Sequence, residues 1–388
     1  MKTFEIIVPV LFGMEAVTAR EIRNLGYETT AVEDGRITFL GDREAVARAN
    51  IWLRTGERVM IKMGEFSARS FTELFDKTAA LPWAEFIGKT DKFPVKGSCL
   101  KSQLHSVPDC QSIIKKSVAE TLKKQHGVRE LPETGAVCQI AFRVFKDSVT
   151  LMIDTSGAGL HKRGYRLLHN EAPLRETMAA AMIILSRFRY DGAFADPFCG
   201  SGTIPIEAAL IAKNIAPGLY RRFAAEHMGF MDEELWKDAR EEARDEIRDS
   251  KIKIFASDIE QSAVDLTLGN SKKAHVSDLI TVTKADVKDF YNPARGGTIV
   301  CNPPYGERLS DKETCRQIAR DMGRVFKRQK DWTMFALTPL EDFETCFGMP
   351  ASKKRKLYNG MIRCDLYEYM PRGIQTLKKK APEKGAER

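Results

Sequence analysis

The stretch Asp196-Pro197-Phe198-Cys199-Gly200-Ser201-Gly202-Thr203 decides the fold of this chain. It continues from a short apolar run at 193–198 that reads as a strand, and an apolar segment with helical spacing follows it. The two glycines let the backbone approach a ligand closely, and the start of the helix supplies free N–H groups. A lone G-x-G is usually a tight turn, but its place between a strand and a helix predicts a cofactor site.

Further runs of strand-forming residues follow this loop at intervals that leave room for helices. They lie at 252–257, 280–284, 298–301 and 332–338. Strands that alternate with helices predict a parallel, doubly wound α/β sheet. Residues 357–358 and 363–369 then flank Asn359-Gly360, a dipeptide typical of a tight turn. We therefore expect an antiparallel hairpin to close the sheet.

Acidic residues at the ends of three successive strands indicate which cofactor binds. A dinucleotide site would need a third glycine where the chain has Pro205, and Asp196 would repel a pyrophosphate. Asp196 suits a ligand that carries an ammonium and a sulfonium, as S-adenosylmethionine does. Asp258 can accept hydrogen bonds from ribose hydroxyls, and Asp286 can accept from the adenine amino group. Each acid alone commonly caps a helix or a turn, but the three together predict one site.

The tetrapeptide Asn302-Pro303-Pro304-Tyr305 follows the strand at 298–301 and is the candidate catalytic motif. Two prolines cannot donate to a strand ladder, so the strand must end there. Ligands of open α/β sheets bind beyond the carboxyl ends of the strands, which places this rigid polar and aromatic clamp beside the cofactor. The alternative is that Asn302 caps a turn and Tyr305 belongs to the core.

The clamp suits an amino group on a nucleobase, which is a poor nucleophile because its lone pair is delocalised into the ring. The side-chain oxygen of Asn302 and the carbonyl of Pro303 could accept both hydrogens and direct the nitrogen toward a methyl group. Tyr305 could stack on a base extracted from its strand. The proton can leave after methyl transfer, so neither a dedicated base nor a metal is required.

The first 155 residues predict two α+β units. The first has strands at 4–10, 29–32, 36–40 and 59–63 and helices at 14–25 and 42–53. The second starts near residue 66 and has helices at 71–80 and 109–125, a strand from 93, and strands at 137–145 and 148–154. Asp42 should cap the helix that follows it, and Gly127 should end the longest helix of the second unit.

Composition bounds the class of protein. The chain has 388 residues, 43% of them hydrophobic and 29% charged, so we expect two or three well-cored domains. Its start lacks the features of a signal peptide, and no apolar run approaches the roughly 20 residues that span a bilayer. The eight cysteines contain no C-x-x-C pair. We therefore expect a cytoplasmic protein without a zinc site or a disulfide framework.

Positive charge is unevenly distributed along the chain. The net charge is +8, and the tail at 371–388 holds six Lys or Arg and two Glu. Residues 353–356 form a second basic cluster. Such clusters favour a phosphate-rich partner, although a solvated chain end is the plain alternative for the tail. The charged segment 231–251, with Trp236, Ala239, Ala243 and Ile247 along one face, predicts a surface helix without assigned chemistry.

The motifs DPFCGSGT and NPPYGERL together resemble the class I, Rossmann-like, S-adenosylmethionine-dependent amino-methyltransferases. More narrowly, the chain resembles the ribosomal RNA guanine-N2 methyltransferases that carry a THUMP domain. Three further segments support the narrower resemblance: HKRGYR at 161–166, EAPLRET at 171–177, which is similar to the family's extra cofactor motif, and SVPDCQ at 106–111, which is similar to the THUMP pattern.

The resemblance covers nearly the whole chain and implies its organisation. Residues 1–62 should form a ferredoxin-like subdomain, 63–155 a THUMP RNA-binding domain, 160–370 a methyltransferase domain with a mostly parallel seven-stranded sheet, and 371–388 a basic tail. The larger bacterial relatives fuse a second methyltransferase domain. Since this chain stops after one, the resemblance implies that it makes only the guanine-N2 mark.

The functional residues of the family map onto this chain motif by motif. The implied catalytic residues are Asn302, Pro303, Pro304 and Tyr305. The implied cofactor residues are Thr177, Asp196, Pro197, Phe198, Cys199, Gly200, Ser201, Gly202, Thr203, Asp258, Ile259, Asp286 and Val287. RNA contacts are expected from Lys101, Lys115, Lys116, Lys123, Lys124, Lys162, Arg163 and Arg166, and solvated helix faces are the alternative for the lysines.

The activity implied by the resemblance is methylation of the N2 amino group of a guanosine in large-subunit (23S) rRNA, free or within a pre-ribosomal particle. Three alternatives stay open: a tRNA guanine-N2 methyltransferase, a DNA adenine-N6 methyltransferase, in which N-P-P-Y also occurs, and a non-catalytic RNA-binding assembly factor. The THUMP-like half favours structured RNA over DNA, and the intact motifs favour an enzyme.

Overall fold

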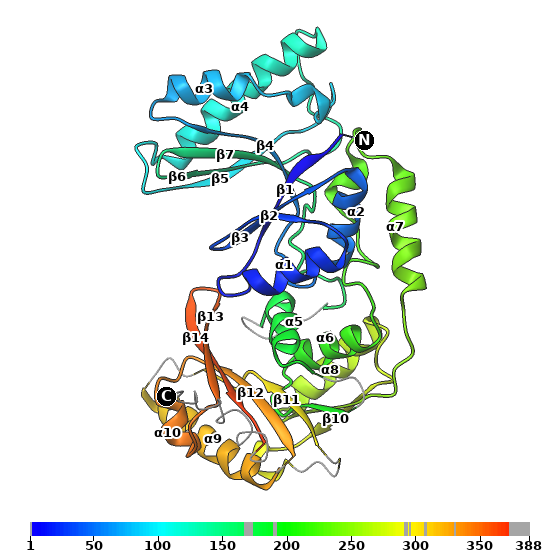
Figure 1. The fold of residues 1–388 in the computed structure, drawn as a ribbon, viewed down its shortest axis with the longest axis vertical. Coiled ribbons are helices and arrows are strands. Elements are labelled where there is room, and N and C mark those ends of the chain that lie inside the picture. The colour runs from blue at the N-terminus through cyan, green and yellow to red at the C-terminus, as the bar shows by residue number, and fades with distance from the viewer. Residues whose placement is uncertain are drawn as a thin grey trace, which may run out of the picture. The chain divides into compact units, whose positions relative to one another are not determined.

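A computed structural model describes residues 2–166, 174–188, 192–290, 294, 296–305, 309–329 and 331–371, with the backbone alone at 309 and 310. The basic tail beyond residue 371, the start of the 171–177 motif and the Gly-Glu-Arg after Tyr305 lie outside these residues. The chain divides into two compact units (Figure 1). Unit 1 comprises Met1–Val10, Met14–Arg163 and Ala216–Glu246, and unit 2 comprises Leu11–Gly13, Gly164–Ile215 and Ile247–Arg388.

Unit 1 is built on one seven-stranded, mostly antiparallel sheet. Its strands lie in the order β2 (Thr29–Glu33), β3 (Arg36–Gly41), β1 (Phe4–Pro9), β4 (Met60–Ser67), β7 (Ser148–Asp154), β6 (Ile140–Phe145) and β5 (Val95–Leu100). Only the pair β5–β6 is parallel among these described strands. Strand β4 pairs with β1 at Met60 and Ile61 and with β7 along its whole length, so the predicted boundary between residues 62 and 63 falls inside one strand.

The helices of unit 1 begin and end where local chemistry favours it. They are α1 (Glu15–Asn24), α2 (Arg43–Trp52), α3 (Phe71–Ala79), α4 (Val107–His126) and α7 (Glu233–Asp245). The Asp42 side chain accepts from the Ala45 N–H at 3.0 Å and caps α2. Gly127, with φ of 66°, ends α4 in the left-handed conformation. Both predicted helix boundaries are confirmed, and α3 and α4 cover one face of the β4-β7-β6-β5 part of the sheet (Figure 1).

The residues Ala216–Glu246, which include most of the charged segment 231–251, form an insert that belongs to unit 1 although it interrupts the sequence of unit 2. Its helix α7 buries Trp236, Ala239 and Ala243, so the predicted apolar face is confirmed at these positions. Ile247, the fourth residue expected on that face, lies beyond the end of the helix. Arg48 of α2 donates to Glu242 of α7 at 2.7 and 2.8 Å. The insert is therefore a fixed part of the N-terminal half.

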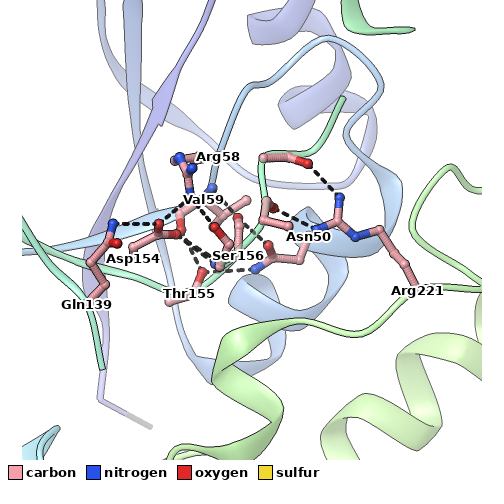
Figure 2. A network of polar contacts seen from close by, with 11 residues as sticks. Asn50, Arg58, Val59, Gln139, Asp154, Thr155, Ser156 and Arg221 are labelled. Atoms are coloured by element: carbon pink, nitrogen blue, oxygen red, sulfur yellow. Dashed lines mark hydrogen bonds and ion pairs between the residues drawn. The ribbon is translucent and has the colours of Figure 1, made fainter. Parts of the chain in front are cut away.

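A buried polar network joins α2, β4, β7 and the insert (Figure 2). Asn50 donates to the Thr155 hydroxyl at 2.9 Å and accepts from the Ser156 hydroxyl at 2.6 Å. These two hydroxyls also bond the backbone of Val59, at 2.6 and 2.8 Å. Arg221 of the insert donates to three backbone carbonyls in the segment that follows β7. The partners of this network all come from the protein itself, so its role is structural.

Unit 2 is a seven-stranded α/β sheet. Its strands lie in the order β10 (Ile280–Lys284), β9 (Lys253–Asp258), β8 (Ala193–Asp196), β11 (Gly297–Cys301), β12 (Trp332–Thr338), β14 (Ile362–Tyr369) and β13 (Lys353–Asn359). The first five are parallel, and β14 and β13 add an antiparallel hairpin. The predicted doubly wound sheet with a closing hairpin is confirmed.

Helices cover both faces of this sheet (Figure 1). They are α5 (Glu176–Leu185), α6 (Thr203–Ala212), α8 (Gln261–Lys273), α9 (Leu309–Arg328) and α10 (Phe343–Phe347). On one face, buried residues of α9 and α10 form a continuous core with the inward side chains of β8, β11, β12 and β14. No helix in the described ranges of either unit is long and apolar enough to cross a bilayer.

Candidate active site

A cavity of about 640 Å³ lies at the carboxyl ends of β8, β9, β10 and β11. Most of the predicted cofactor residues line it: Asp196, Pro197, Phe198, Cys199, Gly200, Ser201, Thr203, Asp258, Ile259, Asp286 and Val287. Asn302 and Pro304 of the clamp line the same cavity, together with residues of α9. Gly202, Thr177, Pro303 and Tyr305 are not among the lining residues. Strand ends of one sheet thus bring the two main sequence motifs to one place.

Asp196, the last residue of β8, is the most unusual group in the cavity. It is 1% exposed, and its Oδ1 accepts from the Phe198 N–H at 3.0 Å. Its Oδ2 is buried and has no hydrogen-bond partner among the described residues. Burial, with a smaller contribution from Asp258, raises the pKa of Asp196 to about 8. A buried acceptor without a partner is costly, so the site fits a ligand that brings a cationic donor.

Asp258 holds the glycine loop in place. Its Oδ2 accepts from the Gly200 N–H at 3.0 Å, and its Oδ1 accepts from the Glu260 N–H at 3.0 Å. Gly200 and Gly202 have φ values of 53° and 86°, in the left-handed region that favours glycine. A Cβ on Gly202 would also lie 3.0 Å from the side chain of Thr267. Both glycines are therefore required by the conformation of the loop.

Two residues of α8 that the sequence analysis missed support this loop from behind. The Thr267 hydroxyl donates to the Gly200 carbonyl at 2.9 Å, and the Asn270 amide donates to the Ser201 carbonyl at 2.8 Å. Both side chains are buried. The available signal is a pair of polar residues on the inward face of the helix after β9. That signal can be interpreted only when the position of the loop against the helix is known.

The other end of the cavity combines an acid with apolar side chains. Asp286 accepts from the Lys288 N–H and pairs with its ammonium, each at 3.0 Å. Burial opposes its ionisation, but the Lys288 contacts outweigh this and lower the pKa of Asp286. Val287 is buried, and Ile259 lines the cavity although it is 57% exposed. An acid next to apolar side chains suits the flat ring and amino group of adenine.

The candidate catalytic tetrapeptide contains an internal hydrogen bond. The Tyr305 hydroxyl donates to Oδ1 of Asn302, and Sγ of Cys364 on β14 lies 3.6 Å from the same hydroxyl. Burial raises the pKa of the Tyr305 phenol, so it stays neutral and can donate. In this structure Tyr305 orients the Asn302 amide. Tyr305 is not among the residues that line the cavity, and the stacking of a base on its ring stays a prediction.

The two arginines of the basic segment at 161–166 bond to other residues of the protein. Arg163 is 5% exposed and donates to the backbone carbonyls of Leu160 and Arg54, which contradicts its predicted contact with RNA. Arg166 donates to the Thr203 hydroxyl at 2.5 Å and pairs with Glu176 at 3.3 Å. It therefore supports the start of α6 beside the glycine loop. Its Nε has no partner among the described residues, and a contact of this residue with RNA stays a prediction.

The predicted RNA-binding lysines divide into two groups. Those with exposed side chains stay candidates for phosphate contacts: Lys101, Lys116, Lys123, Lys124 and Lys162. Lys115 bonds both carboxylate oxygens of Glu133, at 2.6 and 2.7 Å, and lies 3.5 Å from the centre of the Phe93 ring. Its charge is already paired within unit 1, so it is a poor candidate for RNA binding.

The fold and the cavity define a class I methyltransferase that uses S-adenosylmethionine. The residues present fit this cofactor, because Oδ2 of Asp196 lacks the cationic donor that an ammonium group would supply. Asp258 would face the ribose and Asp286 the adenine, by their order along the sheet edge. Across the described residues no cluster of three or more potential metal ligands occurs.

Comparison with known families identifies each part of the chain. Residues 163–368 match the family described as "RMKL-like, methyltransferase domain", 5–60 match the "RlmL ferredoxin-like domain", and 68–154 match the THUMP domain. The chain belongs to the RMKL-like family of methyltransferases and carries the THUMP domain expected from its sequence.

Related proteins span the whole chain. "Putative RNA methyltransferase YpsC" of Bacillus subtilis is 45% identical over 372 residues, which cover 95% of this chain and 96% of that protein. "Ribosomal RNA large subunit methyltransferase K/L" of Psychromonas ingrahamii is 30% identical over 371 residues, and these cover 93% of this chain and 49% of the relative. The chain thus spans about half the length of the K/L protein.

Solved structures agree with this fold over nearly the full chain. The protein described as "SMU.472, a putative methyltransferase complexed with SAH" is 40% identical with a TM-score of 0.91, over 96% of this chain and 99% of that one. A protein from Listeria monocytogenes described as a "predicted N6-adenine-specific DNA methylase" is 47% identical with a TM-score of 0.92, over 96% of this chain and 97% of that one. The bound SAH in the first structure supports S-adenosylmethionine as the cofactor here.

Proposed function

We propose that the chain transfers a methyl group from S-adenosylmethionine to the exocyclic N2 amino group of a guanosine in 23S rRNA. The observation that carries this proposal is that Asn302 lines the same cavity as Asp196, Asp258 and Asp286. An amide that can accept the hydrogens of an amine therefore shares one cavity with the acids that suit the cofactor.

The chain's own groups prepare the amine for attack. Oδ1 of Asn302 can accept two hydrogen bonds, and Tyr305 supplies one of them, which leaves a site for one hydrogen of the substrate amine. The carbonyl of Pro303 can accept the other. Bonds to both hydrogens favour a tetrahedral, nucleophilic nitrogen and hold it in line for transfer. When bound, the cofactor supplies an electrophilic methyl group on a sulfonium. The new nitrogen–carbon bond forms as the sulfur–carbon bond breaks, and the surplus proton then leaves to water.

RNA as the substrate is supported by the THUMP domain and by the names of the two related methyltransferases from Bacillus subtilis and Psychromonas ingrahamii. Guanine N2 and large-subunit rRNA rest on the motif resemblance and on the K/L relative. A base in a helix must leave its stack to reach a cavity of this kind. The proposal therefore includes extraction of the target guanine.

DNA adenine-N6 methylation is the alternative with an observation of its own. The Listeria monocytogenes protein is described as an adenine-specific DNA methylase, and the N-P-P-Y clamp accepts either amino group. The THUMP domain and the RNA methyltransferase names favour RNA. A tRNA guanosine is the nearer alternative, because it would require the same clamp and the same cofactor site.

The test is methyl transfer by Asn302→Ala, with exposed Asn24→Ala as the matched control. Loss of a positioned hydrogen-bond acceptor should lower the rate of transfer to rRNA about 100- to 1,000-fold, while the affinity for SAH stays within about twofold. Mass spectrometry of nucleosides should identify N2-methylguanosine as the wild-type product. Full activity of Asn302→Ala would refute the mechanism, and methylated adenine as the product would refute the assigned substrate.

A further inference from the structure

The hairpin β13–β14 projects beyond the edge of the sheet that carries the active site. Strand β14 pairs with β12 only as far as Thr338 and Asp365, whereas it pairs with β13 up to Asn359 and Ile362. Because β12 runs parallel to β11 and ends at Thr338, the unpaired part of the hairpin extends past the carboxyl ends of the strands. That is the edge at which the tetrapeptide begins.

The projecting part lies against the catalytic tetrapeptide. Sγ of Cys364 is 3.6 Å from the Tyr305 hydroxyl, which in turn donates to Asn302. Cys364 and its cross-strand neighbour Leu357 are buried. The base of the projection is therefore packed and fixed, and it holds the tip next to the group that is proposed to receive the amine.

The tip itself is apolar and solvent-exposed. Met361 is 98% exposed and Ile362 is 40% exposed, at the turn that follows Asn359-Gly360. Single exposed apolar residues are common on protein surfaces, but these two stand at the tip of a hairpin beside the candidate active site. Proteins that extract bases or kink nucleic acids insert side chains of this kind between base steps.

The hairpin is rich in cations, and two of them lie near its tip. From residue 353 to 369 the hairpin carries five cations, Lys353, Lys354, Arg355, Lys356 and Arg363, and two carboxylates, Asp365 and Glu368. Lys354 pairs with Asp365 at 3.5 Å. Lys356 and Arg363, which are nearest to the tip, have no carboxylate partner among the described residues and are exposed. The register places both on one face of the hairpin, where Lys356 also lies 5.8 Å from the centre of the Tyr358 ring. Exposed cations beside an apolar tip match a nucleic-acid strand, which presents phosphates outside and bases inside.

We infer that the tip of the β13–β14 hairpin is the surface that receives the RNA strand around the target nucleotide. This inference rests on the proposed function and specifies how its substrate docks. Met361 contacts the bases that the extracted guanine leaves behind, and Lys356 and Arg363 neutralise the flanking phosphates. The competing explanation is that lysines on β13, an edge strand of the sheet, only prevent edge-to-edge association.

The test uses the full chain and a transcript of large-subunit rRNA that carries no modifications. Binding should be measured over a series of salt concentrations for the double variant Lys356→Glu/Arg363→Glu. The matched control is Lys272→Glu/Lys273→Glu at the far end of α8, where the helix reaches the opposite edge of the sheet. We expect at least a tenfold loss of RNA affinity and a salt slope lower by about two for the hairpin variant only. Equal behaviour of the two double variants would overturn the inference.

Met361 is tested separately by single-turnover methyl transfer. Met361→Ser should slow transfer about tenfold with an unchanged affinity for SAH, and Met361→Leu should restore the wild-type rate because it keeps the apolar volume. Wild-type rates for both variants would remove Met361 from the docking surface. If the double variant loses RNA affinity while the wild type forms no N2-methylguanosine, the docking surface stands and the proposed function fails. Thermal unfolding of each variant should show that all of them remain folded.

Discussion

Two aspartates, Asp154 in unit 1 and Asp196 in unit 2, occupy similar places at the ends of strands but differ in their hydrogen-bond partners. Both are the last residues of their strands and both are buried. Asp154 accepts from the N–H groups of Ser156 and Gly157 through one oxygen, and from Arg58 and Gln139 through the other (Figure 2). Asp196 has one backbone partner, and its second oxygen has none among the described residues.

The difference teaches where to look for a ligand. Burial raises the pKa of Asp154, and the charge of Arg58 opposes this effect. Among the described residues, no cation opposes the effect of burial on the pKa of Asp196. A buried carboxylate with hydrogen-bond partners inside the protein stabilises the fold. A buried carboxylate without such partners is costly until a cation binds to it, so it favours binding of a cationic ligand.

The largest expected effect is on cofactor binding by Asp196→Asn. The amide cannot form the charged interaction with an ammonium group, so the affinity for SAH should fall about a hundredfold, or about 3 kcal/mol. Calorimetric titration measures this change. Asp278→Asn, which alters an exposed acid that pairs with Lys213, is the matched control and should bind like the wild type. An unchanged affinity in Asp196→Asn would remove this residue from the cofactor site.

The opposite pattern is expected for Asp154→Asn. Substitution leaves Arg58 without its carboxylate and disturbs the network around Asn50, so the free energy of unfolding should fall by about 2 kcal/mol. Urea denaturation of the full chain measures this loss. The SAH affinity of the folded variant should stay within about twofold of the wild type. If Asp154→Asn lost cofactor affinity and kept its stability, the contrast between the two aspartates would be refuted.

A smaller effect is expected from pH. Only the ionised form of Asp196 attracts a cation, and its pKa in the cofactor-free protein is about 8. SAH affinity should therefore rise about tenfold per unit below that pH and level off above it, and Asp196→Asn should lack this component. Because the pKa is raised in the folded state, the native protein binds the extra proton, and the stability from this group falls as pH rises from about 4 to about 8. A wild-type profile that parallels the variant would contradict this assignment.

Much of the fold of unit 2 could be predicted from local sequence. Its five parallel strands are short apolar or β-branched runs, so residue type and turn chemistry located them. Strand β13 is the exception, because its first four residues are basic and only 357–358 were predicted. The strand-end rule then placed Asp196, Asp258, Asp286 and Asn302 at one edge, where the structure has them. The positions of these strands and acids therefore follow from local sequence and one rule of sheet topology, without knowledge of long-range contacts.

The features that the sequence did not reveal all depend on contacts between distant segments. Strand β4 pairs with β1 on one side and with β7 on the other, so the two α+β units predicted for the N-terminal half share one sheet. The residues of a strand do not indicate which strands it will pair with. The insert is bonded to the rest of unit 1 by Arg48 of α2, which donates to the insert, and by its own Arg221. Arg163 looks like a surface residue in the sequence, but it is buried and donates to two backbone carbonyls inside the fold, and Arg166 donates to the Thr203 hydroxyl. The bond from the Tyr305 hydroxyl to Asn302 also could not be predicted from the sequence, which suggested only a role for the Tyr305 ring.

The measurement that tests the account most directly is quantitative mass spectrometry of nucleosides from rRNA, tRNA and DNA of a strain that lacks this chain. We predict that 23S rRNA loses one N2-methylguanosine, which the wild-type gene restores and the gene for Asn302→Ala does not. A 23S rRNA with its full set of N2-methylguanosine, together with loss of a methylated nucleoside from tRNA or DNA, would contradict the account.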